Sequence, residues 1–178
     1  TPLYSNLQNL IGDTYINDLA NFGGWGNREL NTDTLYVYGG SKSGKVFGGN
    51  GGGSLEKDLT GVMKPNTSYR VRAKIYASGG PFLFGVSGWD TSKADTALTI
   101  NNANLWQTAD FRFTTGNQTG TGPALFFRNK GTLNQTGYID NWEAYEIQSA
   151  SAVENIFQNK CVAYFSTHKL IVNIELLN

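Results

Sequence analysis

Basic side chains alternate with apolar ones along residues 69–76, and this is the clearest chemical pattern in the sequence. If the apolar set points into a core, the basic set points to solvent, because successive side chains of a strand lie on opposite faces. Arginine carries a planar fork of N–H donors that suits carboxylates and pairs of neighbouring hydroxyls. The candidate ligand-binding side chains of this type are Arg72, Arg112 and Arg128, with Tyr76 beside them.

These arginines fall on three separate segments, so their effect depends on which segments share a sheet. If the segments share one sheet, the arginines line a basic groove that favours an acidic polysaccharide. If they lie on two sheets, they are separately solvated surface charges. The sequence leaves both alternatives open.

The four tryptophans form the second chemical feature, because flat aromatic rings stack on the C–H faces of sugars. Trp25 lies among glycines that cannot bury it, and Trp89 ends a strand on the side opposite Phe82 and Phe84. We expect Trp25 and Trp89 to be exposed stacking platforms, with loop anchors as the alternative. Trp106 and Trp142 are expected in the core.

Catalytic groups are sparse. The single histidine is His168 and the single cysteine is Cys161, and neither an HExxH nor a G-x-S-x-G motif is present. A retaining glycosidase needs two carboxyl groups about 5 Å apart, and no motif nominates such a pair among the 14 acidic residues. We therefore expect a protein that is not an enzyme.

Composition narrows the class of protein. The 178 residues carry a formal net charge of zero, which gives no global field to attract nucleic acid. No apolar run approaches the ~20 residues of a membrane span. One cysteine excludes an intrachain disulfide, and 22 glycines favour many short strands joined by tight turns.

The spacing of apolar residues and turn signals predicts an all-β protein, an antiparallel β-sandwich. A short strand is expected at 34–38, followed by a glycine-rich loop over 39–53. The other expected strands are 54–60, 69–77, 81–88, 96–100, 106–114, 123–129 and 138–147. We expect one domain over residues 1–148, with a linker and a strand pair over 149–178.

Several segments resemble the jelly-roll, galactose-binding-like carbohydrate-binding modules of families four, nine, sixteen and twenty-two. The matching segments are Asn9-Leu10-Ile11 with Trp25, then 55–59, 63–73, 106–115 and 138–145. The resemblance covers roughly residues 9–147. It implies a polysaccharide or oligosaccharide ligand, a linked or associated glycan-degrading enzyme, and a secreted or cell-surface location. The alternatives are an adhesion module without a sugar ligand, and a small polysaccharide lyase or hydrolase.

The same resemblance implies one structural Ca²⁺, held partly by the aspartate of the closing strand. Asp140 matches that aspartate, whereas the acidic residue that the family carries near its N-terminus is not clearly present. Asp13, Asn17 or Asp18 would have to replace it. Calcium takes six to eight oxygen ligands, so backbone carbonyls would be needed as well.

The C-terminal segment has a resemblance of its own. Residues 151–174 are similar to the beginning of the C-terminal sorting domains of Bacteroidetes type IX secretion, which follow a small linker. The segment stops too early for a whole domain of that kind. A plain additional β-hairpin is the alternative.

Overall fold

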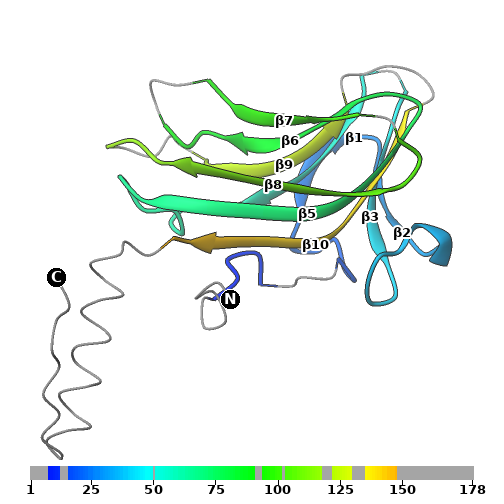
Figure 1. The fold of residues 1–178 in the computed structure, drawn as a ribbon, viewed down its shortest axis with the longest axis horizontal. Helices are drawn as coiled ribbons and strands as arrows, with labels where there is room; N and C mark the ends of the chain where they lie inside the picture. The colour runs from blue at the N-terminus through cyan, green and yellow to red at the C-terminus, as the bar shows by residue number, and fades with distance from the viewer. Residues whose placement is uncertain are drawn as a thin grey trace, which may run out of the picture. The chain divides into compact units, whose positions relative to one another are not determined.

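The chain folds into two antiparallel five-stranded sheets that face each other, as the computed structural model shows (Figure 1). Within the described residues, no helix is long and apolar enough to cross a membrane. The expected linker and strand pair at 149–178 lie outside the described residues. The structure describes residues 8–12, 16–49, 51–90, 94–101, 103–117, 122–129 and 135–147.

Sheet A has the strand order β1-β4-β9-β6-β7 and sheet B the order β2-β3-β10-β5-β8. The strands of sheet A are β1 (Gly23–Gly26), β4 (Gly53–Asp58), β9 (Ala124–Asn129), β6 (Phe82–Ser87) and β7 (Thr96–Ile100). The strands of sheet B are β2 (Arg28–Asn31), β3 (Ser43–Phe47), β10 (Thr136–Glu146), β5 (Ser68–Ser78) and β8 (Trp106–Thr114). A 3₁₀ turn, η1 (Thr34–Tyr36), follows β2.

Alternation along β5 places its apolar residues in the core and its basic residues outside, as predicted. Tyr69, Val71 and Ile75 are buried between the sheets, whereas Arg72 and Lys74 are partly exposed on the outer face. The strand lies inside sheet B, with β10 on one side and the edge strand β8 on the other. The side chains that β5 turns outward therefore lie between those of its two neighbours.

The core between the sheets is rich in aromatic rings. Trp142 is fully buried, stacks on Phe22 and contacts Phe84, which confirms the prediction that it is a core residue. Phe82 stacks on Phe127 with ring centroids 5.0 Å apart. Burial of such large rings supplies much of the hydrophobic stabilisation of a domain of this size.

The predicted fold class is confirmed, and so are the seven strands expected beyond residue 53, to within two residues at each end. The segment before residue 53 differs. Residues 34–38 are not a strand, because the Asp33 side chain accepts a hydrogen bond from the Leu35 N–H and starts the η1 turn. The expected glycine-rich loop contains β3, and β1 and β2 precede it.

Candidate functional site

An aromatic cluster covers one end of the outer face of sheet B. Tyr36 stacks on Tyr138, with centroids 4.3 Å apart and planes 2° from parallel, and meets Tyr76 edge-on at 5.1 Å. Trp106 contacts Tyr76 at 5.9 Å and Tyr38 at 5.6 Å, both edge-on. The aromatic cluster is therefore a chain of five rings, each in contact with at least one other. The rings come from β5, β8, β10 and residues 34–39, which we call the η1 segment.

Two strands of sheet B explain why Tyr76 and Trp106 meet. Tyr76 lies directly opposite Trp106 in the β5–β8 pair and opposite Tyr138 in the β5–β10 pair. Directly opposed residues of antiparallel strands have Cβ atoms roughly 5 Å apart, so three large rings in one row must touch. The row is thus fixed by strand register rather than by loop conformation.

The η1 segment adds the two remaining rings, and buried polar groups hold it in place. The Asn31 amide donates to the carbonyls of Asp33 and Tyr36 and to the Ser43 hydroxyl. The Asp140 carboxylate accepts hydrogen bonds from the N–H groups of Tyr38 and Gly39, at 3.0 and 2.9 Å. These contacts tie the segment to sheet B.

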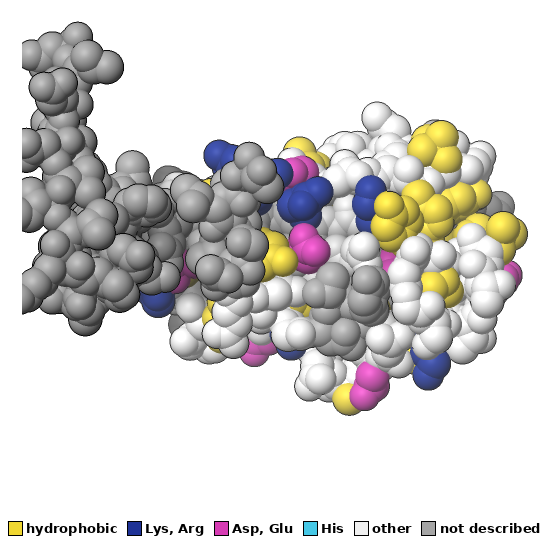
Figure 2. All heavy atoms as spheres, turned by 60° about the horizontal axis from the view of Figure 1, so that its bottom comes forward, with side chains coloured by type: hydrophobic (Ala, Val, Ile, Leu, Met, Phe, Trp, Pro, Cys, Tyr) yellow, Lys and Arg dark blue, Asp and Glu magenta, His cyan; other side chains and the backbone are white. Residues whose placement is uncertain are grey.

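Exposure divides the aromatic cluster into supporting and accessible rings. Tyr138 is buried, and burial raises the pKa of its hydroxyl to about 12, so it stays neutral at physiological pH. Tyr38 is 45% exposed, and Tyr76 and Trp106 are partly exposed. Figure 2 shows hydrophobic side chains gathered on one face of the molecule, next to basic and acidic ones.

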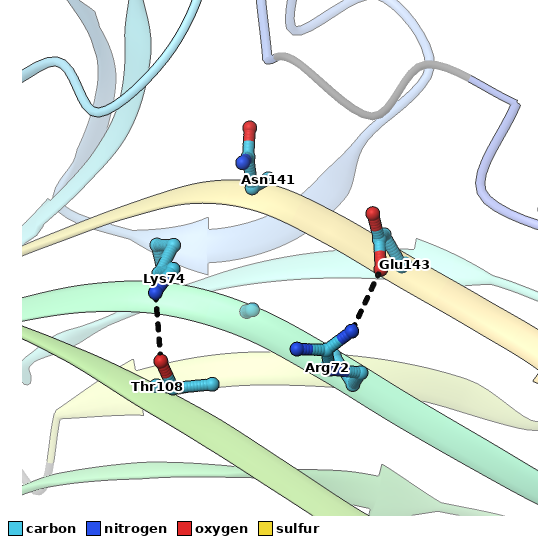
Figure 3. A pocket seen from close by; sticks show the side chains of 6 residues that line it. Arg72, Lys74, Thr108, Asn141 and Glu143 are labelled. Carbon is cyan, nitrogen blue, oxygen red and sulfur yellow. Dashed lines mark hydrogen bonds and ion pairs between the residues drawn. The ribbon is translucent and has the colours of Figure 1, made fainter. Parts of the chain in front are cut away.

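A polar pocket of about 180 Å³ lies beside the aromatic cluster on the same face. Its side chains come from three adjacent strands, and Figure 3 shows them around the opening. Lys74 joins the two regions, because its Nζ donates to the Thr108 hydroxyl at 2.8 Å and lies 4.7 Å from the centre of the Tyr38 ring. The polar pocket is lined by Arg72, Ala73, Lys74, Thr108, Asn141 and Glu143.

A β-bulge in β10 places several of these polar groups together. The register of β10 against β5 shifts between Asp140 and Glu143, and Asn141 has a left-handed φ of 47°. An extra residue in one strand lets two neighbours point to the same face and increases the local twist. Asp140, Asn141 and Glu143 are thereby collected around the outer face, while Trp142 fills the core.

Ion pairs continue the charged region across sheet B. The Arg70 Nε donates to Asp110 at 2.9 Å, and this hydrogen bond lowers the pKa of the Asp110 carboxyl below its usual value. Arg72 lies 3.4 Å from the same carboxylate and 3.9 Å from Glu143. Arg112 also lies on this face, opposite Arg70.

Three of the predicted ligand residues, Arg72, Arg112 and Tyr76, lie together on the outer face of sheet B. Arg128 does not join them. It lies on β9 of sheet A, pairs with Asp95 at 3.0 Å and stacks over a phenylalanine ring of its own strand. The hypothesis of one basic groove lined by all three arginines is therefore wrong, because the arginines lie on two sheets.

The tryptophans differ from expectation in two places. Trp89 is only 7% exposed and packs edge-on against Phe113, so it is not an exposed platform. Gly88, with φ of 61°, ends the alternation of β6 and turns the next side chain inward. Trp106 lies on the outer face rather than in the core. Trp25 is 43% exposed on β1 of sheet A, and its role in ligand binding stays a prediction.

The alternation of buried and exposed residues along β8 could have predicted that Trp106 lies on the outer face. Ala109 and Phe113 are buried, so even-numbered residues of this strand point outward, and Trp106 shares that parity with Arg112. Tyr36 and Tyr38 carry no such signal, because their position depends on contacts with residues more than 100 positions away.

The residues expected to hold Ca²⁺ do not fit a cation well. Asp140 accepts hydrogen bonds from Tyr38, Gly39, Asn141 and Ile16 N–H groups, and a carboxylate has about four lone-pair positions. Asp18 is exposed, and its carboxylate accepts a hydrogen bond from the Ala20 N–H. In the part of the chain that the structure describes, no three His, Cys, Asp or Glu side chains cluster. Asp13 lies outside that part.

Comparisons with known proteins identify the family. The family profile described as "Carbohydrate binding domain" (CBM_4_9) matches residues 8–134. A search of curated proteins gives no match.

Solved structures of carbohydrate-binding modules share the fold. "Family 16 Carbohydrate Binding Module-2" superposes with a TM-score of 0.62 at 22% identity, over 78% of this chain and 100% of that one. TmCBM61 in complex with β-1,4-galactotriose superposes with a TM-score of 0.59 at 12% identity, over 79% of this chain and 99% of that one. The CBM22-1 xylan-binding domain of Xyn10C from Paenibacillus barcinonensis superposes with a TM-score of 0.55 at 13% identity, over 73% of this chain and 88% of that one. With the profile match over most of its length, this chain belongs to the carbohydrate-binding domain family.

Proposed function

We propose that the outer face of sheet B binds a polysaccharide, with the aromatic cluster contacting sugar rings and the polar pocket contacting hydroxyl groups. The observation that carries this proposal is that three neighbouring rings of the aromatic cluster are accessible to solvent: Tyr38, Trp106 and Tyr76. Edge-on contacts hold each ring, so little side-chain freedom is lost when a sugar stacks on it. The membership of the chain in the family supports a sugar as the ligand.

We further propose that the protein is not catalytic and serves to hold a linked or associated glycan-degrading enzyme near its polymer. A tether converts binding into a high local concentration of substrate, up to the millimolar range for a short flexible linker. A polymeric ligand of this kind supports our proposal that the protein is secreted or lies on the cell surface. Affinity of the isolated module is expected to be modest, because an open face gains only a few contacts.

Calorimetric titration of the full chain with hexasaccharides of β-1,4-glucan, β-1,4-mannan, β-1,4-xylan and β-1,4-galactan tests the site. Trp106→Ala is expected to weaken the affinity for the best-binding hexasaccharide by at least about ten-fold, as for an aromatic hot spot. Trp25→Ala is the matched control, because it removes an exposed indole from sheet A. Loss of binding in Trp25→Ala with retention in Trp106→Ala would place the site on the other sheet.

The same titration tests the function itself. If a folded wild-type protein binds none of these sugars and none of their uronic-acid counterparts, the adhesion alternative replaces the proposal. Release of reducing ends from any of the polymers would contradict the non-catalytic role.

A further inference from the structure

Three arginines gather around one carboxylate on the outer face of sheet B. Arg70 and Arg112 lie directly opposite each other on β5 and β8, and Arg72 lies opposite Asp110. Two nitrogens of Arg70 donate to the two oxygens of Asp110, whereas Arg72 lies 3.4 Å from that carboxylate. The hydrogen bond from Arg70 lowers the pKa of the Asp110 carboxyl, and the charges of Arg72 and Arg112 lower it further. We call Arg70, Arg72 and Arg112 the arginine cluster.

The arginine cluster carries more positive than negative charge. Glu143 is the second carboxylate beside it, 3.9 Å from Arg72. Among the described residues, three guanidiniums thus face two carboxylates, which leaves one positive charge in excess. Like charges directly opposite each other on neighbouring strands are destabilising, and Arg70 and Arg112 have this arrangement. The next charges along this face are balanced in two pairs: Lys64 beside Glu146, and Lys74 across from the buried Asp140.

Arg72 has hydrogen-bonding capacity that its neighbours do not use. Its distances to Asp110 and Glu143, 3.4 and 3.9 Å, are longer than the 2.7–3.2 Å of an N–H···O hydrogen bond. Its Nε is buried and has no hydrogen-bond partner among the described residues, although buried polar atoms are normally paired. Figure 3 shows Arg72 and Glu143 approaching each other from β5 and β10. The guanidinium can therefore bind a ligand oxygen without losing a short hydrogen bond.

A carboxylate suits the arginine cluster better than a hydroxyl, because it only accepts hydrogen bonds and brings the missing negative charge. Arg72 and Arg112 are diagonal neighbours on β5 and β8, a spacing that long side chains can bridge. One ligand carboxylate can accept from both of them. Tyr145 lies opposite Arg70 on β10, and burial raises the pKa of its hydroxyl, which stays protonated and can donate as well.

The arginine cluster and the aromatic cluster lie in line along β5. Arg72 and Tyr76 face the same way and are four residues apart, which is about 13 Å at the rise of a β-strand. The polar pocket, lined by Arg72 and Lys74, lies along this path. A sugar chain that stacks on Tyr76 and Trp106 can therefore cross the pocket and place a substituent of a later sugar at the arginine cluster.

We propose that the arginine cluster is a subsite for the carboxylate of a uronic acid, so that the protein prefers an acidic polysaccharide to its neutral counterpart. Arg72 and Arg112 contact the carboxylate, while Arg70 engages Asp110. The proposal rests on the proposed function of the same face. It differs from the groove that the sequence suggested, because Arg70 takes part and Arg128 does not.

Matched oligosaccharides test the preference by calorimetric titration of the full chain. β-1,4-Glucan and β-1,4-mannan hexasaccharides are compared with the corresponding β-1,4-glucuronate and β-1,4-mannuronate hexasaccharides, which carry a carboxylate at C6. We expect the better-binding uronate to bind at least about four-fold more tightly than its neutral counterpart, as one Coulomb attraction at about 5 Å in water implies. Added salt should reduce this uronate-to-neutral ratio, because it screens the attraction.

Arg112→Gln removes one charge of the arginine cluster from an exposed position outside the polar pocket. We expect it to reduce the uronate-to-neutral ratio by about four-fold, while the affinity for the neutral sugar changes by less than about three-fold. Arg72→Gln should reduce the ratio as well. Arg128→Gln is the matched control, because it removes a guanidinium from sheet A, and it should leave the ratio unchanged.

The possible outcomes separate this inference from the proposed function. Equal or tighter binding of the neutral sugars by the wild type would overturn the inference and leave the proposed function standing. An unchanged ratio in Arg112→Gln, or a ratio lost in Arg128→Gln, would also overturn the inference alone. Absence of binding to all four sugars would overturn the proposed function together with it.

Discussion

Replacing Asp140 by asparagine tests whether this carboxylate positions the aromatic cluster without a metal. An asparagine side chain keeps one oxygen and puts an amide N–H₂ where the second carboxylate oxygen was. Two of the four backbone N–H groups around it would then face a donor instead of an acceptor. If these are Tyr38 and Gly39, the η1 segment loses its tie to sheet B.

The expected loss of stability is about 2 kcal/mol. Each unpaired buried N–H costs about 1–3 kcal/mol, and the loss is partly offset because asparagine avoids burying a charge. Burial already raises the pKa of Asp140, although the N–H donors oppose that shift. For a domain of this size, about 2 kcal/mol lowers the unfolding temperature by about 6 °C.

Urea unfolding followed by tryptophan fluorescence measures the change, with Trp142 as a buried reporter. Asp18→Asn, an exposed aspartate, should change the unfolding free energy by less than about 0.5 kcal/mol. Since the folded pKa of Asp140 is raised, its contribution is largest below its unfolded pKa and falls as pH rises through the folded one. The difference between wild type and Asp140→Asn should therefore be larger at pH 4 than at pH 7.

A metal-bound Asp140 would behave differently. If EDTA lowers the unfolding temperature of the wild type by several degrees and has no effect on Asp140→Asn, the carboxylate holds a cation and the reasoning above is wrong. Unchanged stability in Asp140→Asn would also refute it. At a temperature where the variant is folded, we expect weaker glycan binding, because Tyr38 is no longer held.

Three further changes have expected outcomes. Gly44→Ala should destabilise the fold by about 1–3 kcal/mol in urea unfolding, because its Cβ would lie 2.6 Å from Leu55 Cδ2. Asp110→Asn should remove a stabilising contribution that is present above the unfolded pKa and lost as pH falls through the lowered folded pKa. After allowance for solvent screening it should be below about 1 kcal/mol, measured by acid unfolding. Tyr138→Phe should remove the tyrosine that ionises at about pH 12 in an ultraviolet titration, and its persistence would contradict the assignment.

Among the strands beyond residue 53, β5 and β8 were predictable because their alternation is regular and one face of each is buried. The strands β4, β6 and β9 were predictable from short apolar runs between turn signals, because several successive residues of each are buried. Those before residue 53 were not, because glycine has no side chain to show which face is buried. Gly44 lies in the middle of β3, and an added Cβ there would collide with Leu55 and Ile139. The two sheets pack so closely at this point that only glycine fits. In the sequence alone, a glycine among other glycines indicates a loop instead.

The candidate site was predictable only where it is built on a strand. Arg72 and Tyr76 were found from the alternation of β5 alone. Asn141 was missed because a bulge breaks the alternation of β10, and no local sequence pattern marks that break. Trp89 was misplaced for a related reason, since the glycine before it turns the chain.

The mutual contacts of the five rings have a consequence for how this surface can diverge. Tyr76 touches three of the other four rings, so a change at any one position alters the support of its neighbours. Homologues should then exchange these aromatic residues as a group or keep them all. Adaptation to a new sugar is easier through Thr108, Asn141 and Glu143, whose side chains can be replaced one at a time.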